Sequence, residues 1–329
     1  MTLTGKQALV IIGMHRSGTS ASTGALRCVG VELGRKLYRG HKGINDKGYF
    51  EHSDIADAND EALAVLGSSW DDILLRNEDW WLGKELLPYE KKIRSYIRRD
   101  FSGSPLWAVK DPRVCRLLPW WLGMLEAEQV KPHFVFVIRS PLAVHRSLER
   151  RDGFSIDKSF LLWSLHYLEA ERWSRGHSRV FIDFDHFLEN PAQGLSKMEK
   201  SLGIRYPVPV ENATACLKQF LSTDLRHHGK DEEMQERSPA IEIALSLHER
   251  LLAASKNDAG NPEQEEMDRL WHSMENLQQS FPSALVEHIR SSGSVRGKIQ
   301  ITMNKIMRSG SWLTGKPVRF LERLAGRDV

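Results

Sequence analysis

The chain has 329 residues, of which 41% are hydrophobic and 27% are charged, and its formal net charge is +3. This composition is typical of a soluble globular protein with one large domain, or one domain and an appendage. So small a net charge gives no support for nucleic-acid binding. The longest apolar runs, such as residues 8–12 and 134–138, are far shorter than the ~20 residues of a membrane-spanning helix.

The first strand is predicted at residues 8–12, and a helix at 19–29 follows it and ends at Gly30. The predicted elements then continue in this order: a glycine-rich loop at 31–60, a helix at 85–99, strands at 105–111 and 133–140, helices at 142–150 and 156–174, and a strand at 179–185. Strands that alternate with helices predict a parallel sheet covered by helices on both faces.

The pattern changes from about residue 231 onward. Single-sided apolar stripes predict two helices, the first opened by Ser238 and Pro239 and the second carrying Met267, Trp271 and Met274. A turn between them predicts a helical hairpin. The segment from Ser294 onward is basic and moderately apolar, and we expect either a loosely ordered tail or a peripheral contact with an anionic membrane surface. The chain is therefore expected to divide into a domain at 1–230 and a helical appendage with its tail at 231–329.

Three cysteines, Cys28, Cys115 and Cys216, are scattered without a CxxC spacing. An odd and sparse set predicts free thiols in a reducing compartment rather than a disulfide framework, and it does not predict a zinc site. We find no basic segment followed by a long apolar one, so the sequence does not predict a signal peptide. We therefore expect a cytoplasmic protein that needs no metal.

Polar side chains follow every predicted strand. Lys110 and Asp111 come after the second strand, Arg139 after the third, and Asp183 ends the fourth. Because ligands of open parallel sheets bind at the carboxyl ends of the strands, these residues predict a ligand site at that edge.

The stretch GMHRSGTS, residues 13–20, joins the first strand to the first helix. Gly13 and Gly18 let backbone amides point at an anion, and the start of the helix adds partial positive charge. Hydroxyl donors come from Ser17, Thr19 and Ser20, and Arg16 adds a cation with His15 beside it. Thr19 stands where a Walker loop has its lysine, which counts against hydrolysis of a nucleoside triphosphate.

This stretch resembles the 5′-phosphosulfate loop of bacterial sulfotransferases that use 3′-phosphoadenosine 5′-phosphosulfate (PAPS) and have an H-R-S-G-T-S loop. The resemblance spans about residues 7–205 and implies an α/β fold with a P-loop-like central parallel sheet. It implies that PAPS is the sulfuryl donor. The cofactor-binding residues that it implies in the loop are Gly13, His15, Arg16, Ser17, Gly18, Thr19 and Ser20.

In that family an arginine that ends a strand, and a serine eight positions later, hold the 3′-phosphate. The residues at this separation are Arg139 and Ser147, with Pro141 at the start of the helix between them. We therefore expect two separated sites of positive charge, around Arg16 and Arg139, at opposite ends of one donor. The basic stretch LRHHG at 225–229 is similar to the late loop that closes over the nucleotide in this family.

Transfer to a hydroxyl benefits from a general base. Glu51, in GYFEHSDI, is the favoured candidate, since it resembles a catalytic glutamate of some carbohydrate sulfotransferases. Asp111 is the second candidate, and Lys110 is expected to stabilise the transferring group. Both carboxylates have structural alternatives: Glu51 as the cap of a helix near Asp54, and Asp111 as the partner of Arg113 or the cap of a helix after Pro112.

The tail sequence RSGSWLTGKPVRFLERL resembles a tail of bacterial cell-surface polysaccharide enzymes, which implies a carbohydrate acceptor. The predicted function is transfer of a sulfuryl group from PAPS to a hydroxyl or amino group, with a cell-surface carbohydrate as acceptor and without a nucleic-acid partner. The alternatives are a P-loop kinase of a small molecule, with Asp183 on Mg²⁺, and a non-catalytic protein that binds nucleotide or glycan. The oligomeric state stays open.

Overall fold

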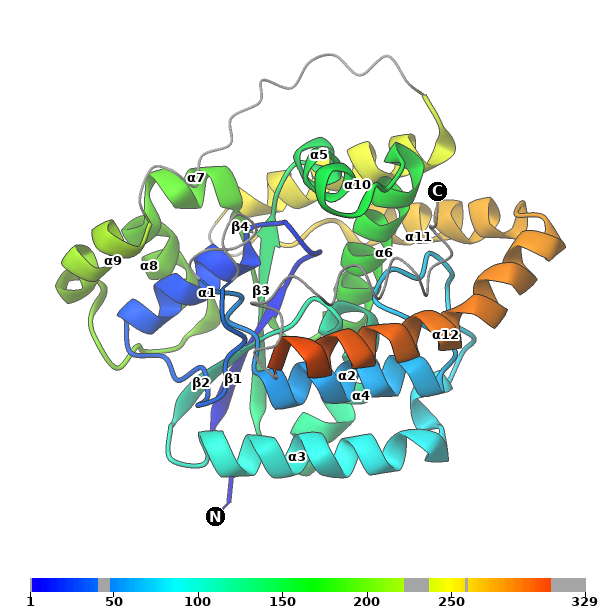
Figure 1. Cartoon of the computed structure of the whole chain (residues 1–329). Coiled ribbons are helices and arrows are strands. Elements are labelled where there is room, and N and C mark those ends of the chain that lie inside the picture. The colour runs from blue at the N-terminus through cyan, green and yellow to red at the C-terminus, as the bar shows by residue number, and fades with distance from the viewer. Residues whose placement is uncertain (1, 41–47, 222–236, 258–259, 309–329) are drawn as a thin grey trace.

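The computed structural model describes residues 2–40, 48–221, 237–257 and 260–308, without the side chains of 294 and 303–308. A four-stranded sheet in the order β2-β1-β3-β4, with every neighbouring pair parallel, forms its centre (Figure 1). The strands are β1 Gln7–Ile12, β2 Leu106–Lys110, β3 Lys131–Ile138 and β4 Ser178–Asp183. The predicted α/β fold with a central parallel sheet between helices is thereby confirmed.

Helices make up most of the remaining described chain. The α-helices are α1 Thr19–Cys28, α2 Ser53–Val65, α3 Leu87–Phe101, α4 Val114–Ala127, α5 Pro141–Asp152, α6 Ile156–Ser174, α7 Phe184–Glu189, α8 Pro191–Leu202, α9 Thr214–Phe220, α10 Pro239–Ser255, α11 Gln264–Gln279 and α12 Ser283–Arg308. Three short 3₁₀ turns are η1 Trp80–Leu82, η2 Lys84–Leu86 and η3 Val210–Ala213.

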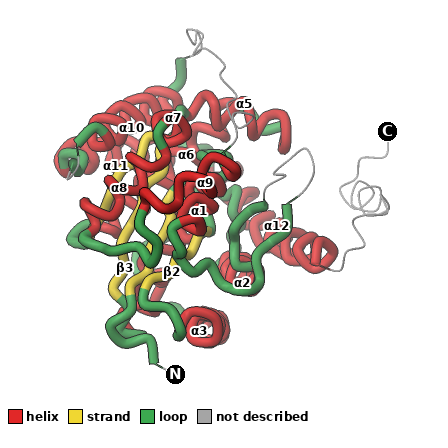
Figure 2. The backbone as a smooth tube through the Cα atoms, turned by 90° about the vertical axis from the view of Figure 1, so that its left-hand side faces the viewer, coloured by secondary structure: helices red, strands yellow, loops and turns green. Residues whose placement is uncertain are grey.

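The sheet separates two apolar cores, because alternate residues of a strand point to opposite faces. Leu9 and Ile11 of β1 join α1, α7 and α8 in one core, whereas Val10 and Ile12 join α4, α6 and α10 in the other. Figure 2 shows helices on both sides of the strands. Burial of both faces explains why each strand is a nearly continuous apolar run.

The carboxyl ends of the strands lie at one edge of the sheet. In the parallel register, Ile11 is paired with Lys110, Ile12 with Phe136, and Ile138 with Asp183. The polar residues that follow these strands are therefore gathered at the same edge, as the strand order requires.

Two helices were absent from the predicted order of elements and were considered only as the helices that Glu51 and Asp111 could cap. Helix α2 overlaps the end of the stretch expected to be a loop, and it begins after His52, whose Nδ1 accepts a hydrogen bond from the Ile55 amide at 3.3 Å. Helix α4 contains Pro119 and is buried on nearly every side, with Trp121 fully enclosed. A helix that is apolar all around has no 3.6-residue stripe, which is why the pattern did not identify it.

The predicted hairpin corresponds to α10 and α11, which pack against each other. Ser238 caps α10 by accepting a hydrogen bond from the Ile241 amide at 3.3 Å. Helix α10 also packs against α6 and β4, and its residues Ile241 and Leu247 belong to the core beneath the sheet. The division of the chain at residue 230 stays a prediction.

The expectation of a loosely ordered tail from Ser294 is wrong for residues 294–308, which continue helix α12. This helix lies along α2 (Figure 1). Gly293 and Gly297 make the close contact: a Cβ added to Gly293 would lie 2.0 Å from Gly67 O, and one added to Gly297 would lie 2.6 Å from Ala64 Cβ. The tail sequence at 309–329 and its membrane contact lie outside the described residues. Within the described ranges, no helix combines the length and apolar character that a bilayer crossing requires.

The expectation of free thiols is wrong for two of the three cysteines. Cys28 at the end of α1 and Cys216 in α9 form a disulfide across 188 residues of sequence, and Cys115 is free and buried. A pairing over so long a separation leaves no local spacing that a sequence pattern could reveal. The disulfide removes the support that the cysteines gave to a reducing compartment, and the cytoplasmic location stays a prediction.

Candidate active site

The loop after β1 turns sharply and then starts α1. Arg16 and Gly18 adopt left-handed backbone conformations, with φ of 70° and 85°, and the Ser17 amide donates to Met14 O at 3.1 Å. Gly18 is the N-cap of α1, and no side chain caps that end of the helix. The first amides of α1 therefore lack a side-chain acceptor, which suits the start of this helix to an anion.

Gly18 is required by space as well as by backbone conformation. A Cβ at this position would lie 2.1 Å from the ring of Phe184, which is the first residue of α7. Gly13 is similarly enclosed, since a Cβ there would lie 2.7 Å from Thr19 Cγ2. The ring of Phe184 therefore packs directly against the loop, a contact between distant segments that no sequence pattern indicates.

The hydroxyl residues of the loop have different surroundings. Ser17 and Thr19 are buried, and Ser20 Oγ donates to the carbonyl of Tyr49 at 3.2 Å. His15 packs edge-on against Trp70, with ring centroids 4.6 Å apart. Burial lowers the pKa of His15 well below its usual value, and the charge of Arg151 lowers it further. His15 is therefore neutral in the loop, and it does not add to the positive charge of Arg16.

The residues expected at the two ends of the donor are in direct contact. Arg16 Nε donates to Ser147 Oγ at 2.7 Å, and Arg139 Nη1 donates to the carbonyl of Arg16 at 2.8 Å. The expected separation into two sites is therefore wrong for the side chains as they lie here. Burial lowers the pKa of Arg16, and a buried guanidinium needs acceptors, which Ser147 provides.

Arg139 follows the last residue of β3, and its side chain contacts an aromatic ring and the loop. Its guanidinium lies 5.5 Å from the centre of the Phe184 ring, and its carbonyl accepts from Trp163 Nε1 at 3.2 Å. Arg139 Nε is buried and has no hydrogen-bond partner among the described residues. Burial lowers the pKa of this arginine, partly offset by the charge of Asp185. A buried donor without a protein partner is what an anion site requires.

A buried ion pair lies beside the loop. Lys110, the last residue of β2, donates from Nζ to Glu51 Oε1 at 2.6 Å, and both side chains are less than a tenth exposed. The same ammonium contacts the carbonyl of Tyr49 at 3.2 Å and Ser20 Oγ at 3.3 Å. Glu51 does not cap α2, because His52 does. The alternative role of Glu51 as the cap of a helix near Asp54 is therefore wrong.

Of the two structural alternatives for Asp111, the pairing with Arg113 is confirmed, whereas the helix cap is wrong, because the N-cap of α4 is Arg113 and no side chain caps that end. Asp111 Oδ1 accepts from the Arg113 amide at 3.0 Å and from Arg113 Nη1 at 2.9 Å, and Asp111 Oδ2 accepts from Asn59 Nδ2 at 2.8 Å. Asn59 is held in turn by Trp121 Nε1 at 3.0 Å. Asp111 is thus committed to the protein on both oxygens, whereas Glu51 is held chiefly by a lysine.

Other residues near the loop were not predicted from the sequence. Arg151 lies 5.4 Å from the centre of the Trp70 ring, and Trp70 stacks on Phe154 with centroids 5.8 Å apart. Arg151 lies in the last turn of α5, Phe154 follows that helix, and Trp70 follows α2, so these residues belong to no local motif that the sequence could indicate. His52, a candidate only by its nearness to Glu51, is bound to Asp100 Oδ2 at 2.7 Å.

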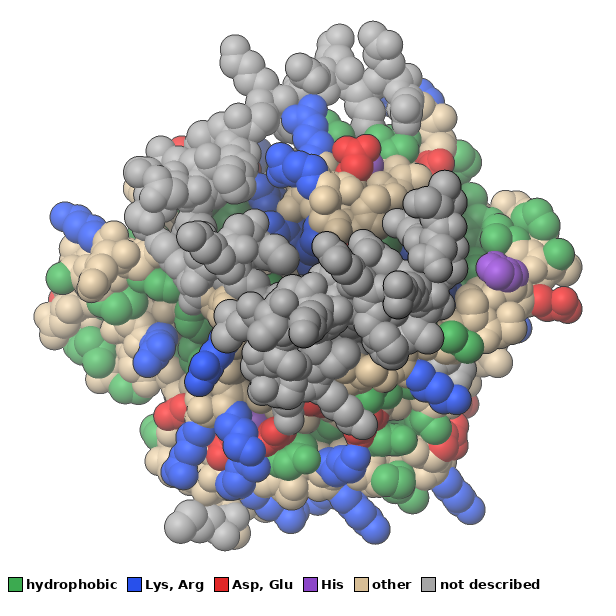
Figure 3. Space-filling model, viewed as in Figure 1, with side chains coloured by type: hydrophobic (Ala, Val, Ile, Leu, Met, Phe, Trp, Pro, Cys, Tyr) green, Lys and Arg blue, Asp and Glu red, His purple; other side chains and the backbone are tan. Residues whose placement is uncertain are grey.

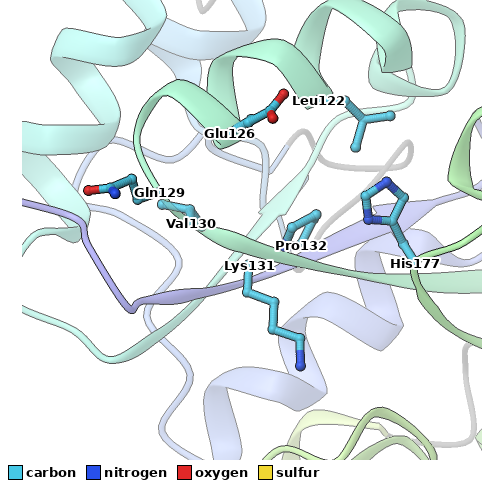
Figure 4. Close-up of a pocket in the computed structure, with 7 residues that line it drawn as sticks. All are labelled: Leu122, Glu126, Gln129, Val130, Lys131, Pro132 and His177. Atoms are coloured by element: carbon cyan, nitrogen blue, oxygen red, sulfur yellow. The ribbon is translucent and has the colours of Figure 1, made fainter.

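The face that carries the loop is basic. In Figure 3, Lys and Arg side chains gather in the upper centre of the view, near the ends of β3 and β4 and beside α5. A pocket at the opposite end of the strands is lined by residues of mixed charge and polarity (Figure 4). Its lining residues are Leu122, Glu126, Gln129, Val130, Lys131, Pro132 and His177. Because Lys131 and Pro132 begin β3, this pocket lies at the amino ends of the strands, away from the candidate site.

Two further sequence predictions concern the basic stretch at 225–229 and the expectation that no metal is needed. The basic stretch at 225–229 lies outside the described residues. Among the residues that are described, no three His, Cys, Asp or Glu side chains are grouped so that they could hold a metal ion.

No family model matches the sequence, and no curated protein matches it. Among solved structures, the protein is similar to the sulfotransferase domain from the Synechococcus PCC 7002 olefin synthase. The two are 14% identical with a TM-score of 0.40, and the match covers 86% of this chain and 98% of that one. The function proposed below depends on the side-chain contacts and not on this similarity.

Proposed function

We propose that this protein is a sulfotransferase that uses PAPS as donor and a carbohydrate hydroxyl or amino group as acceptor. The observation that carries the proposal is the contact of Arg16 with Ser147 and of Arg139 with the Arg16 carbonyl. It joins the anion-binding loop to the arginine and serine that the family resemblance assigns to the 3′-phosphate. When bound, PAPS supplies the sulfuryl group and a phosphate that departs from it.

The residues at this edge fit such a donor. The uncapped start of α1 offers amides to one anionic group, and the buried Arg139 Nε offers a donor to another. Arg16 can serve either group, since it belongs to the loop by sequence and reaches Ser147 by its side chain. Each charge-assisted hydrogen bond of this kind contributes about 1.5–3 kcal/mol.

Glu51 is the proposed general base. It takes the proton of the acceptor hydroxyl as the acceptor oxygen bonds to sulfur and the bond from sulfur to the phosphate oxygen breaks. Lys110 stabilises the negative charge that develops at the transferring group. Asp111 is less suited to the role of base, because both of its oxygens already accept hydrogen bonds from Arg113 and Asn59.

The kinase alternative is not favoured. Asp183 ends β4, which is separated from β1 by β3, so its backbone lies two strand spacings, or about 10 Å, from the loop. Its Oδ1 already accepts from the Asp185 amide at 3.0 Å as the cap of α7. Thr19 stands in the place of the Walker lysine, so the loop itself lacks the cation that a nucleoside triphosphate requires.

The non-catalytic alternative does not explain Glu51. A buried carboxylate and ammonium pair is costly to desolvate and adds little stability compared with apolar packing. Its position beside the loop is what transfer chemistry needs and what simple binding does not.

The test is incubation of the protein with radiolabelled PAPS and a panel of saccharide acceptors. We expect labelled product with the native protein, and a loss of about 10²–10⁴-fold in rate for Glu51→Gln. The affinity for adenosine 3′,5′-bisphosphate should change little in that variant. Near-native activity of Glu51→Gln would move the role of base to Asp111. Bisphosphate binding without labelled product for any acceptor would favour the non-catalytic alternative.

A further inference from the structure

Arg113 lies buried among three carboxylates that come from different segments. Its Nε and Nη2 donate to the two oxygens of Asp60 in α2, at 2.5 and 2.8 Å. Its Nη1 donates to Asp111 Oδ1 at 2.9 Å and lies 3.5 Å from Glu51 Oε2. Glu51 therefore faces two cations, with Lys110 at one oxygen and Arg113 at the other.

The two cations differ in their freedom to move. Arg113 is anchored by a two-pronged pair with Asp60, which fixes the plane of its guanidinium. Lys110 has three N–H donors, and all three have acceptors: Glu51 Oε1, the Tyr49 carbonyl and Ser20 Oγ. An anion at the loop can therefore accept a hydrogen bond from Lys110 only if one of these three acceptors loses its own.

We propose that Arg113 is a positioning residue that holds the Glu51 carboxylate in place while Lys110 shares its donors with the transferring group. This inference rests on the proposed function. Arg113 also ties Glu51 to α2, because Asp60 lies two turns along the helix that begins two residues after Glu51.

Removal of Arg113 alone would leave buried carboxylates without their counter-ion and could prevent folding. The variant to use is therefore the double substitution of Arg113→Met with Asp60→Asn, which removes the anchored pair together. The formal charge of the cluster is unchanged, because one cation and one anion are lost. A matched control is Arg94→Met with Glu128→Gln, a second buried-carboxylate pair at 2.5 Å on α3 and the end of α4.

The first readout needs no acceptor. Hydrogen–deuterium exchange at residues 48–52 is measured in the bisphosphate complex of the native protein, the double variant, the control pair and Lys110→Ala. We expect exchange to increase at least about 10-fold in the double variant only. Unchanged exchange in the double variant, or an equal increase in Lys110→Ala, would overturn the assignment of the fixed role to Arg113.

The second readout separates positioning from folding. With the acceptor that the native protein sulfates, the double variant should lose about 10²-fold in kcat while its affinity for adenosine 3′,5′-bisphosphate stays within about 2-fold of native. The control pair should keep both. A fall in bisphosphate affinity that accounts for the whole loss would overturn the proposal. If the native protein sulfates nothing, the proposed function fails on that result, and the exchange measurement still decides where Arg113 acts.

Discussion

Arg16 and Ser147 are joined by a hydrogen bond of 2.7 Å, although one belongs to the loop after β1 and the other to α5. Arg139 reinforces the contact from the end of β3 by donating to the Arg16 carbonyl. Hydrogen bonds through Arg16 therefore join the loop after β1, the end of β3 and helix α5.

Arg139→Ala should weaken binding of adenosine 3′,5′-bisphosphate by about 10–100-fold, because one or more charge-assisted hydrogen bonds are lost. Titration calorimetry measures the change. Arg150→Ala, which removes an exposed arginine at the end of α5, is the control and should change the affinity less than about 3-fold. Equal effects of the two substitutions would show that only general positive charge matters.

Gly18→Ala should destroy the loop, because its Cβ would meet the Phe184 ring at 2.1 Å in a left-handed backbone conformation. Gly153→Ala is a matched control, since Gly153 has a φ of +68° and open space around it. The control should lose about 1 kcal/mol of stability and keep bisphosphate binding. Urea unfolding and calorimetry measure both quantities, and normal binding by Gly18→Ala would contradict the described packing.

Cys216→Ser should lower the free energy of unfolding by about 2–5 kcal/mol in buffer without reductant, because the link from α9 to α1 is lost. Reductant added to the native protein should produce the same loss and should not affect the variant further. Equal stability of native and variant proteins without reductant would mean that Cys28 and Cys216 are not joined in solution.

His133 should make the protein less stable in acid. Burial lowers its pKa to about 4, and the charge of Lys131 lowers it further, so the folded state keeps it neutral. The unfolded chain takes up the proton below about 6.5, so stability falls as the pH drops from 6.5 to 4, by about 1–3 kcal/mol for this group. His133→Asn should be less stable at pH 7 but should lose about that much less over the same range. An identical loss in both proteins would exclude this contribution.

The sheet and the loop could be predicted from the sequence because their signals are local. Apolar runs mark the strands, and Gly13 and Gly18 bracket a loop whose residues are consecutive. Arg139 and Ser147 were assigned through the family resemblance, from their fixed separation within one strand and helix, and their binding of a phosphate stays a prediction.

The supporting contacts could not be predicted, because they join segments that are far apart. Asp60 and Arg113 are 53 residues apart, and α2 was hidden because its buried side is partly polar, with Asn59 and Asp60 almost fully enclosed. An amphipathic pattern reads such residues as exposed. The disulfide and the packing of Phe184 on Gly18 were missed for the same reason, since only the folded chain brings these residues together.

The most direct test compares adenosine 3′,5′-bisphosphate with adenosine 5′-phosphate by titration calorimetry in the absence of Mg²⁺. We expect the bisphosphate to bind at least about 10-fold tighter, since only it can engage both the loop amides and Arg139. Equal affinities, or tight binding of ATP that requires Mg²⁺, would contradict the account of a PAPS site at this edge of the sheet.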